Sequence, residues 1–194
     1  GTFSEISRYA GVEASDWSWG ALFFDMNNDG NKDLFIANGI LKDLTNQDYL
    51  QYIANEKVIE SIVQEDGVNY KELIDIIPSN KIKNQGYLNN GNLKFEPAES
   101  TGLWEPSFSN GAAYGDLDND GDLDLVVNNI SMPCFVYENT LSSDKANYIK
   151  IDLKSGGSSS KALGSKVIVT SGENKYTYEN MPTRGFQSSM DPRI

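Results

Sequence analysis

A stretch near the start of the chain recurs, without a gap, near its middle. Residues 17–39 (WSWGALFFDMNNDGNKDLFIANG) align with residues 108–130 (FSNGAAYGDLDNDGDLDLVVNNI). Gly20 falls on Gly111 and Asp25 on Asp116, so the two copies are offset by 91 residues. Self-similarity at a fixed spacing indicates repeated supersecondary units that bury a shared core. The fold must therefore accommodate two equivalent units.

Each copy predicts a β-hairpin around a polar loop. The strands expected beside the loops are residues 21–24 and 34–37 in the first copy, and residues 112–115 and 125–127 in the second. The exit runs LFIA and LVV are rich in β-formers and too short for helices. Residues 86–95, with Asn-Gly at the turn, predict a second hairpin, and residues 134–139 a third strand for the second copy. Such groups of short strands are typical of propeller blades.

The segment between the copies has a helical pattern. Residues 44–64 space their apolar side chains as a helix does, after Thr45 and Asp48 in a capping-box arrangement. A shorter helix at 70–77 should end before Pro78. We therefore expect a helical insertion into the first blade at residues 41–83, more as a cap on the sheet than as a binding surface.

After residue 139 the pattern returns to alternating strands. We expect these strands at residues 147–153, 165–171 and 175–180.

Composition excludes several classes of protein. The chain has no histidine and one cysteine, Cys134, so it has no Ser-His-Asp triad, Cys-His dyad or His-ligated zinc site. We expect Cys134 to be a small buried residue. Acidic residues number 28 against 16 basic ones, a net charge of −12, which argues against binding to nucleic acid or to an anionic membrane surface. No apolar run is long enough to span a membrane. We expect the chain to be a fragment whose export signal lies outside it.

The two polar loops carry the clearest chemical signal. Loop 1 is DMNNDGNKD (25–33) and loop 2 is DLDNDGDLD (116–124); both have oxygen side chains at positions 1, 3, 5 and 9 and glycine at position 6. Alternate residues of a tight loop turn their oxygens inward, and glycine permits the bend. Oxygen-only ligation favours Ca²⁺ over zinc or copper. The predicted ligands are the side chains of Asp25, Asn27, Asp29 and Asp33 with the carbonyl of Asn31, and the side chains of Asp116, Asp118, Asp120 and Asp124 with the carbonyl of Asp122.

The loops have two other possible interpretations. An EF-hand needs a glutamate at position 12 and a following helix, whereas position 12 is Ile36 or Val127 inside an expected strand. Ordinary Asp/Asn/Gly turns are the second alternative. Loop 2 has five aspartates, which would repel one another without a cation. Loop 1 has three carboxylates offset by Lys32, so we expect loop 2 to bind Ca²⁺ more tightly.

These motifs resemble a known family. Gly-Ala, a strand, D-x-[DN]-x-D-G-x-x-D-L and then N-G-x-x-x-F resemble the FG-GAP/VCBS repeats of integrin α-subunit propellers and many bacterial surface proteins. The tail, with ALGSKVIV (162–169) and RGFQSS (184–189), resembles the ASPIC/UnbV domain found after such repeats in proteins similar to cartilage acidic protein. The NGILKDLTNQDY stretch (38–49) is similar to surface-exposed or lipoprotein members from Bacteroidetes.

The resemblance divides the chain into two parts. Residues 1–139 would form two FG-GAP/VCBS-like blades with the insertion, each blade a four-stranded antiparallel sheet. Residues 147–194 would form an ASPIC/UnbV-like β module that we expect to be truncated.

The resemblance implies a secreted or surface-anchored protein, with the outer-membrane lipoprotein as one form, in which calcium stabilises a propeller piece that recognises proteins or glycans. It supplies no catalytic residue, so we expect no enzyme. A glycan-active enzyme with paired carboxylates and a purely architectural spacer remain the alternatives. An exposed aromatic cluster using Trp17, Trp19 or Trp104 would favour recognition, although core packing is the expected role of Trp19.

Overall fold

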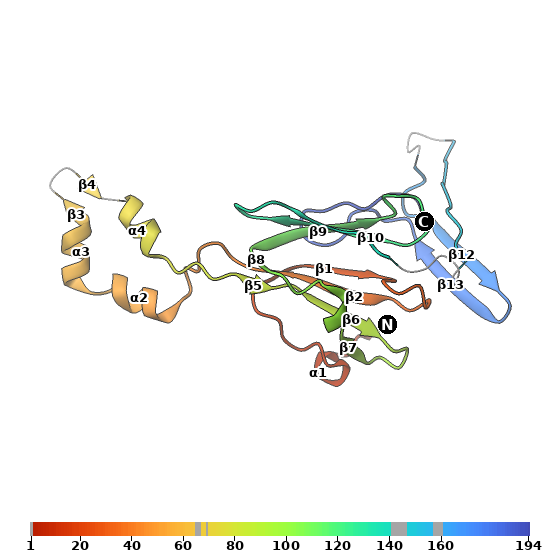
Figure 1. Cartoon of the computed structure of the whole chain (residues 1–194), viewed down its shortest axis with the longest axis horizontal. Coiled ribbons are helices and arrows are strands. Elements are labelled where there is room, and N and C mark those ends of the chain that lie inside the picture. Colours follow the sequence, from red (N-terminus) through yellow and green to blue (C-terminus); the bar gives the residue numbers. More distant parts are fainter. Residues whose placement is uncertain (1, 65–66, 69, 141–146, 157–160) are drawn as a thin grey trace.

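Two small antiparallel sheets carry the two repeats (Figure 1). The computed structural model describes residues 2–64, 67–68, 70–140, 147–156 and 161–194. The first sheet, in the order β1-β2-β6-β7, consists of β1 (Ser18–Phe24), β2 (Asp33–Asn38), β6 (Gln85–Asn89) and β7 (Phe95–Pro97). The second, in the order β11-β10-β9, consists of β9 (Ser109–Gly115), β10 (Asp124–Asn129) and β11 (Phe135–Tyr137). The prediction of a mainly β chain with partial propeller blades is confirmed, although three strands are described in the second sheet rather than four.

The main core lies between the two sheets. Phe35 and Val127 are fully buried, and the rings of Phe24 and Tyr114 stack across the interface with centroids 4.8 Å apart. All six residues of β2 are buried, because this strand is central in its sheet and is covered on both faces. The continuous apolar run LFIA follows from that position, since a strand covered on both faces has no solvent side to fill with polar residues. The core cluster consists of Leu22, Phe24, Phe35, Ala37, Leu103, Ala112, Leu125, Val127 and Met190.

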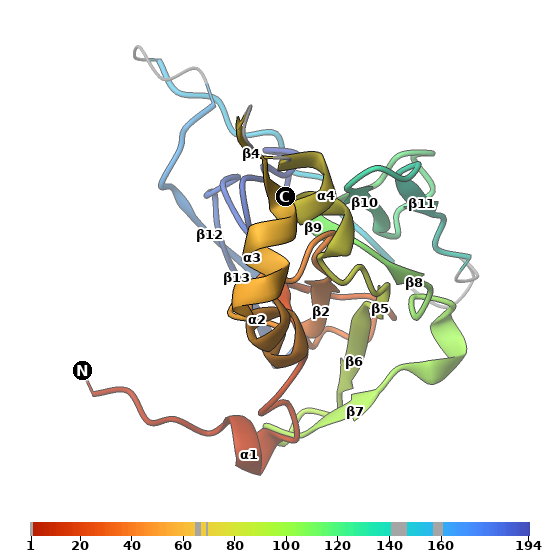
Figure 2. The same ribbon diagram turned by 90° about the vertical axis from the view of Figure 1, so that its left-hand side faces the viewer.

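The helical segment projects from the end of the first sheet that is remote from the C-terminal hairpin (Figure 1). Seen from its own end, it stands in front of the two sheets (Figure 2). Its elements are α2 (Gln47–Ile53), α3 (Glu56–Ile62), β3 (Val63–Gln64), β4 (Gly67–Val68) and α4 (Tyr70–Ile76). The short strand β5 (Ile82–Lys83) follows in the connection back to β6, and it pairs with β8 (Pro106–Ser107), which directly precedes β9.

The sequence expectation for this segment needs two corrections. The single helix expected at 44–64 is two helices, because the Asn55 side chain accepts the N–H of Lys57 at 3.0 Å and so starts a new helix. The residue that caps α2 is Asn46 rather than Thr45, since the Asn46 side chain accepts the N–H of Tyr49 at 3.0 Å.

The C-terminal part consists of one hairpin and a crossing tail. The expected strands at 165–171 and 175–180 are β12 (Lys166–Ser171) and β13 (Asn174–Glu179), which pair antiparallel. The strand expected at 147–153 is absent from the described residues, because this segment pairs only through two backbone hydrogen bonds between Ile151 and Ile194.

The tail, residues 181–194, runs over β1 of the first sheet and β9 of the second. A Cβ atom on Gly20 would lie 3.3 Å from the N atom of Phe186, and one on Gly111 would lie 3.2 Å from Oγ of Ser188. The repeated glycine therefore leaves room for the tail at the same place in each repeat. Farther along, Met190 enters the core cluster. The tail thus connects the two sheets to each other.

The remaining short elements flank the first sheet. They are α1 (Ser7–Ala10), which precedes β1, and the 3-10 turn η1 (Glu99–Thr101), which follows β7.

Two side chains expected inside the protein lie at its surface. Cys134 is exposed, because it precedes the edge strand β11. Trp19 is 36% exposed, and its ring lies 4.9 Å from that of Phe186 in the tail and 6.4 Å from that of Trp17. Its indole N–H donates to the carbonyl of Gly39 at 2.6 Å. Trp104 instead packs against the core cluster.

The central position of β2 predicts a large difference between two phenylalanines on neighbouring strands. Phe35→Ala should lower the free energy of unfolding by about 3–5 kcal/mol, because it leaves a cavity in a fully buried site. Phe23→Ala should lower it by roughly 1 kcal/mol or less, since Phe23 is 49% exposed. Urea denaturation of both variants measures the difference. Equal losses would contradict the placement of the core between the sheets.

Candidate metal centre

The two polar loops have the same backbone geometry. Gly30 and Gly121, at position 6, have φ of +89° and +100°. Asn28 and Asn119, at position 4, also have positive φ, at 55° and 68°. Asparagine is among the few residues that adopt this conformation at low cost. The sequence pointed to the glycines but not to these asparagines, although asparagine stands at position 4 in both copies.

In loop 1 the side-chain oxygens turn toward the loop's own backbone. The carboxylate of Asp25 accepts the N–H groups of Asp29 and Gly30 at 3.1 and 2.8 Å. The carboxylate of Asp29 accepts the N–H of Asn31 at 2.7 Å, and the side-chain oxygen of Asn27 accepts the N–H of Asp29 at 3.2 Å. The loop therefore gathers the oxygens of positions 1, 3 and 5 on its inner side.

Among the described residues, no lysine or arginine forms an ion pair with the carboxylates of loop 1. Burial raises the pKa of Asp25, the hydrogen bond from Gly30 opposes this, and the charge of Asp29 raises it further. Burial likewise raises the pKa of Asp33, against the backbone hydrogen bonds that it accepts. Lys32, expected to offset these charges, forms no ion pair with them in the described part of the chain.

Loop 2 brings three carboxylates together. Asp116, Asp118 and Asp120 each place a carboxylate oxygen within 4.8 Å of the other two. Ligands around one calcium ion, each about 2.3–2.6 Å from it, lie within roughly 5 Å of one another. The N–H of Gly121 donates to Asp116 at 3.1 Å, and the N–H of Asp122 donates to Asp120 at 3.1 Å. The donor set and its spacing fit a calcium ion.

Lys150 approaches the same oxygens from the C-terminal part of the chain. Its ammonium nitrogen lies 2.5 Å from Oδ2 of Asp116 and 3.3 Å from Oδ1 of Asn119. Burial would raise the pKa of Asp116, but the hydrogen bond and the charge of Lys150 outweigh it and lower that pKa. The Asp116 side chain is only 8% exposed, and its Oδ1 has no hydrogen-bond partner among the described residues. Loop 2 is thus a site that already attracts a positive charge.

The aspartate at position 9 connects each loop to the third strand of its sheet. Asp33 accepts the N–H of Met26 and that of Asn89, both at 2.8 Å. Asp124 accepts the equivalent N–H groups, from Leu117 at 2.8 Å and Asn139 at 2.9 Å. Each carboxylate oxygen keeps a second lone pair, so this role leaves ligation possible.

The two strand-end asparagines complete this arrangement, and sequence reasoning missed them. The side-chain amide of Asn89 donates to the carbonyl of Lys32 at 3.0 Å, and that of Asn139 donates to the equivalent carbonyl of Leu123 at 3.4 Å. Asn139 also donates to the carbonyl of Met26 in loop 1 at 2.9 Å. It therefore joins the two loops. The sequence feature that could have identified these two residues is the asparagine that ends both YLN (87–89) and YEN (137–139).

Tyrosines of the C-terminal part cover both loop glycines. A Cβ atom on Gly30 would lie 3.0 Å from the ring of Tyr176, and one on Gly121 only 2.0 Å from the ring of Tyr148. Both loops line one cavity of about 640 Å³, and the two tyrosines and Lys150 line it as well. The C-terminal part thus contributes to the surroundings of the metal centre.

Comparison with known families agrees with this architecture. Residues 72–127 match the family described as FG-GAP-like repeat, and residues 155–194 match the family described as ASPIC and UnbV. These two matches support an FG-GAP repeat protein with an ASPIC and UnbV segment. The first match contains loop 2, whereas loop 1 is connected to the family through the internal repeat. Searches of curated proteins and of solved structures returned no match.

FG-GAP repeats suggest a β-propeller module of the recognition or adhesion type, and they are typical of extracellular or surface proteins. Within the described residues, no helix has the length and apolar character needed to cross a membrane.

The different hydrogen bonds of Asn89 and Asn139 predict that their substitution by alanine lowers stability unequally. Asn139→Ala should lower the free energy of unfolding by about 1 kcal/mol more than Asn89→Ala, because a partly buried hydrogen bond between the two loops is lost. Asn89 is the matched control, since its side-chain bonds lie within the first sheet and are exposed. Chemical denaturation of both variants measures the difference. An equal loss would show that the bond between the loops contributes nothing.

Proposed function

We propose that loops 1 and 2 bind calcium and stabilise the blades of an extracellular recognition module. The observation that carries the proposal is the group of three carboxylates in loop 2, held within 4.8 Å of one another by backbone N–H groups. The ligands would be Asp116, Asp118, Asp120 and Asp124 with the carbonyl of Asp122. In loop 1 they would be Asp25, Asn27, Asp29 and Asp33 with the carbonyl of Asn31.

The role proposed for the metal is structural. Each loop connects two strands of a sheet, and its position 9 aspartate holds the third, so a cation would fix three strands at one end. Extracellular calcium sites of modest affinity, about 10⁻⁴–10⁻³ M, suffice where calcium is abundant. We keep the expectation that loop 2 binds more tightly, because it has more carboxylates and a divalent ion can replace the single charge of Lys150.

The proposed partner is a protein or a glycan met at the cell surface or outside the cell. The net charge of −12 argues against nucleic acid, whose phosphates require basic side chains. A partly exposed aromatic group, Trp19 with the half-buried Trp17 and Phe186, supports recognition over a purely architectural role.

We favour binding over glycan hydrolysis. The mechanism of hydrolysis needs two carboxylates free to act on a glycosidic bond. Of the acidic residues that line the cavities near β13, Asp25 is hydrogen-bonded within loop 1 and Asp191 is paired with Arg193 at a charged hydrogen bond of 2.8 Å. Asp25 and Asp191 therefore have structural partners, which leaves Glu179 as one carboxylate of the smaller cavity without an ion pair among the described residues, where hydrolysis needs two.

Calcium should raise the melting temperature of the purified chain. A ligand that binds only the folded state adds about 2.7 kcal/mol to the free energy of unfolding at a hundred times its dissociation constant. The Asp118→Asn/Asp120→Asn variant should lose most of this gain, because it removes two of the three clustered charges. Thermal melts in EDTA and in millimolar calcium test both statements.

The matched control is Asp48→Asn/Asp75→Asn, two exposed aspartates in the helical insertion. It changes the net charge equally and should keep the full calcium response. If the wild-type chain melts at the same temperature with and without calcium, the loops are ordinary turns.

Lys150 should compete with calcium. Lys150→Met should tighten calcium binding at loop 2 by about three- to tenfold, because the ion would no longer displace an ammonium group. Lys154→Met is the control, since Lys154 lies on the same segment with its side chain 81% exposed and, among the described residues, forms an ion pair with Asp152 alone. Calorimetric titration of calcium into both variants gives the affinities. Weaker binding in Lys150→Met would mean that Lys150 supports the site instead.

A further inference from the structure

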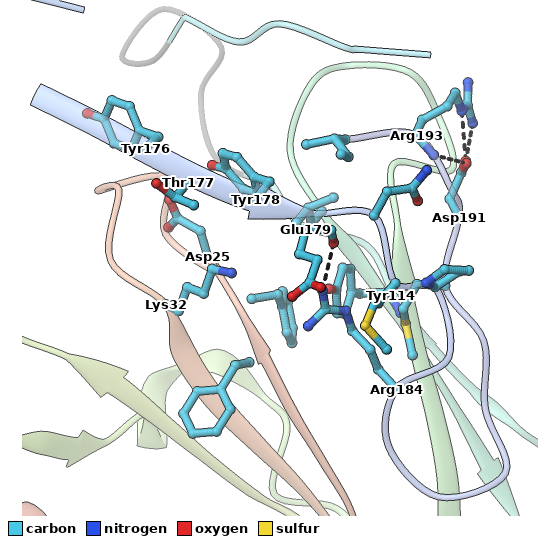
Figure 3. A pocket seen from close by; sticks show the side chains of 18 of the residues that line it. Asp25, Lys32, Tyr114, Tyr176, Thr177, Tyr178, Glu179, Arg184, Asp191 and Arg193 are labelled. Atoms are coloured by element: carbon cyan, nitrogen blue, oxygen red, sulfur yellow. Dashed lines mark hydrogen bonds and ion pairs between the residues drawn. The ribbon is translucent and has the colours of Figure 1, made fainter. Parts of the chain in front are cut away.

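A second cavity, of about 280 Å³, lies between the first sheet and the C-terminal hairpin (Figure 3). Lys32 extends into it from the hairpin of loop 1, and Arg184 from the tail. Tyr114 of β9 and Tyr178 of β13 complete the group. Residues distant in the sequence thus line the same cavity.

Hydrogen-bond donors dominate this group. Lys32 and Arg184 form no ion pair within the described ranges, and one guanidinium N–H donates to the carbonyl of Glu179 at 3.2 Å. The ammonium of Lys32 lies 5.4 Å from the centre of the Tyr178 ring. Two cations that face one cavity repel each other, and that repulsion is relieved when an anion binds between them.

The acidic residues of the cavity differ in how firmly they are held. Asp25 accepts two N–H groups of loop 1, and Asp191 is paired with Arg193. Glu179, labelled beside Arg184 in Figure 3, forms no ion pair among the described residues. Glu179 is therefore the carboxylate whose unpaired negative charge would repel an incoming anion.

We propose that this cavity binds a compact organic carboxylate, an acidic monosaccharide unit such as a uronic acid. The guanidinium of Arg184 and the ammonium of Lys32 would hold the carboxylate, as charged donors do best. The phenol groups of Tyr114 and Tyr178 would offer hydroxyls and apolar ring faces to the sugar. The volume suits one small ligand unit. The proposal rests on the recognition function above and narrows its partner to acidic glycans.

The probe is sodium glucuronate, titrated into the full 194-residue chain in calcium and observed by NMR chemical shifts. Lys32→Met and Arg184→Met should each weaken binding by about tenfold or more, as expected for loss of a charged hydrogen bond. Glu179→Gln should strengthen it several-fold, because a negative charge that repels the anion is removed. Lys166→Met, with the same charge change on the same hairpin but outside the cavity, should bind as the wild type does.

Two further ligands test whether the cavity recognises both the carboxylate and the sugar ring. Glucose, neutral and of similar size, should not bind, and acetate should bind more weakly than glucuronate. Equal affinity for acetate and glucuronate would overturn the sugar assignment, and no glucuronate binding by the wild type would overturn the site.

Each sample is also melted with and without calcium. A variant that keeps the calcium-dependent rise is folded, so its loss of glucuronate binding reports on the cavity. A calcium response without glucuronate binding would overturn only this inference. Glucuronate binding without a calcium response would overturn the metal proposal and leave the cavity standing.

Discussion

The buried aspartate at position 9 of each loop is the interaction on which the rest of the structure depends. Asp33 and Asp124 each accept one N–H group from the start of their own loop and one from the end of a neighbouring strand. A buried carboxylate is costly unless it is hydrogen-bonded, so each fixes the loop and the third strand together. The other loop oxygens are gathered because this end of the loop is held.

The two repeats are joined by side chains that come from outside the repeated pattern. Asn139 reaches from the end of β11 to the carbonyl of Met26, and the tail crosses Gly20 and Gly111 before Met190 enters the core. Without the tail, the surfaces at Gly20 of β1 and Gly111 of β9 would be open to water. The C-terminal part closes this side, and its tyrosines bring it against both loops. The metal centre and the second cavity therefore both lie at the interface between the sheets and the C-terminal part.

The sequence predicted those features that depend on residues close to one another in the chain. The offset of 91 residues located both hairpins, and the alternating oxygens located the loops, because these features depend on neighbours in the chain. Lys150 and Asn139 could not be found this way, since their roles arise from contacts 34 and 113 residues away along the chain, with Asp116 and Met26. The helix break at Asn55 was missed because apolar spacing outweighed a local capping signal. The strand expected at 147–153 had the right alternation but no long partner strand beside it.

The two loops differ in how the negative charge of their carboxylates is compensated. In loop 1 burial raises the pKa of Asp25 and Asp33, and Lys32 turns away toward Tyr178. In loop 2 an ammonium group from the C-terminal part approaches Asp116 and lowers its pKa. A cation in loop 1 would therefore supply a missing charge, whereas one in loop 2 would replace Lys150. Because Lys150 lies two residues from Tyr148, which covers Gly121, ion binding in loop 2 would act directly on the contact that holds the C-terminal part in place.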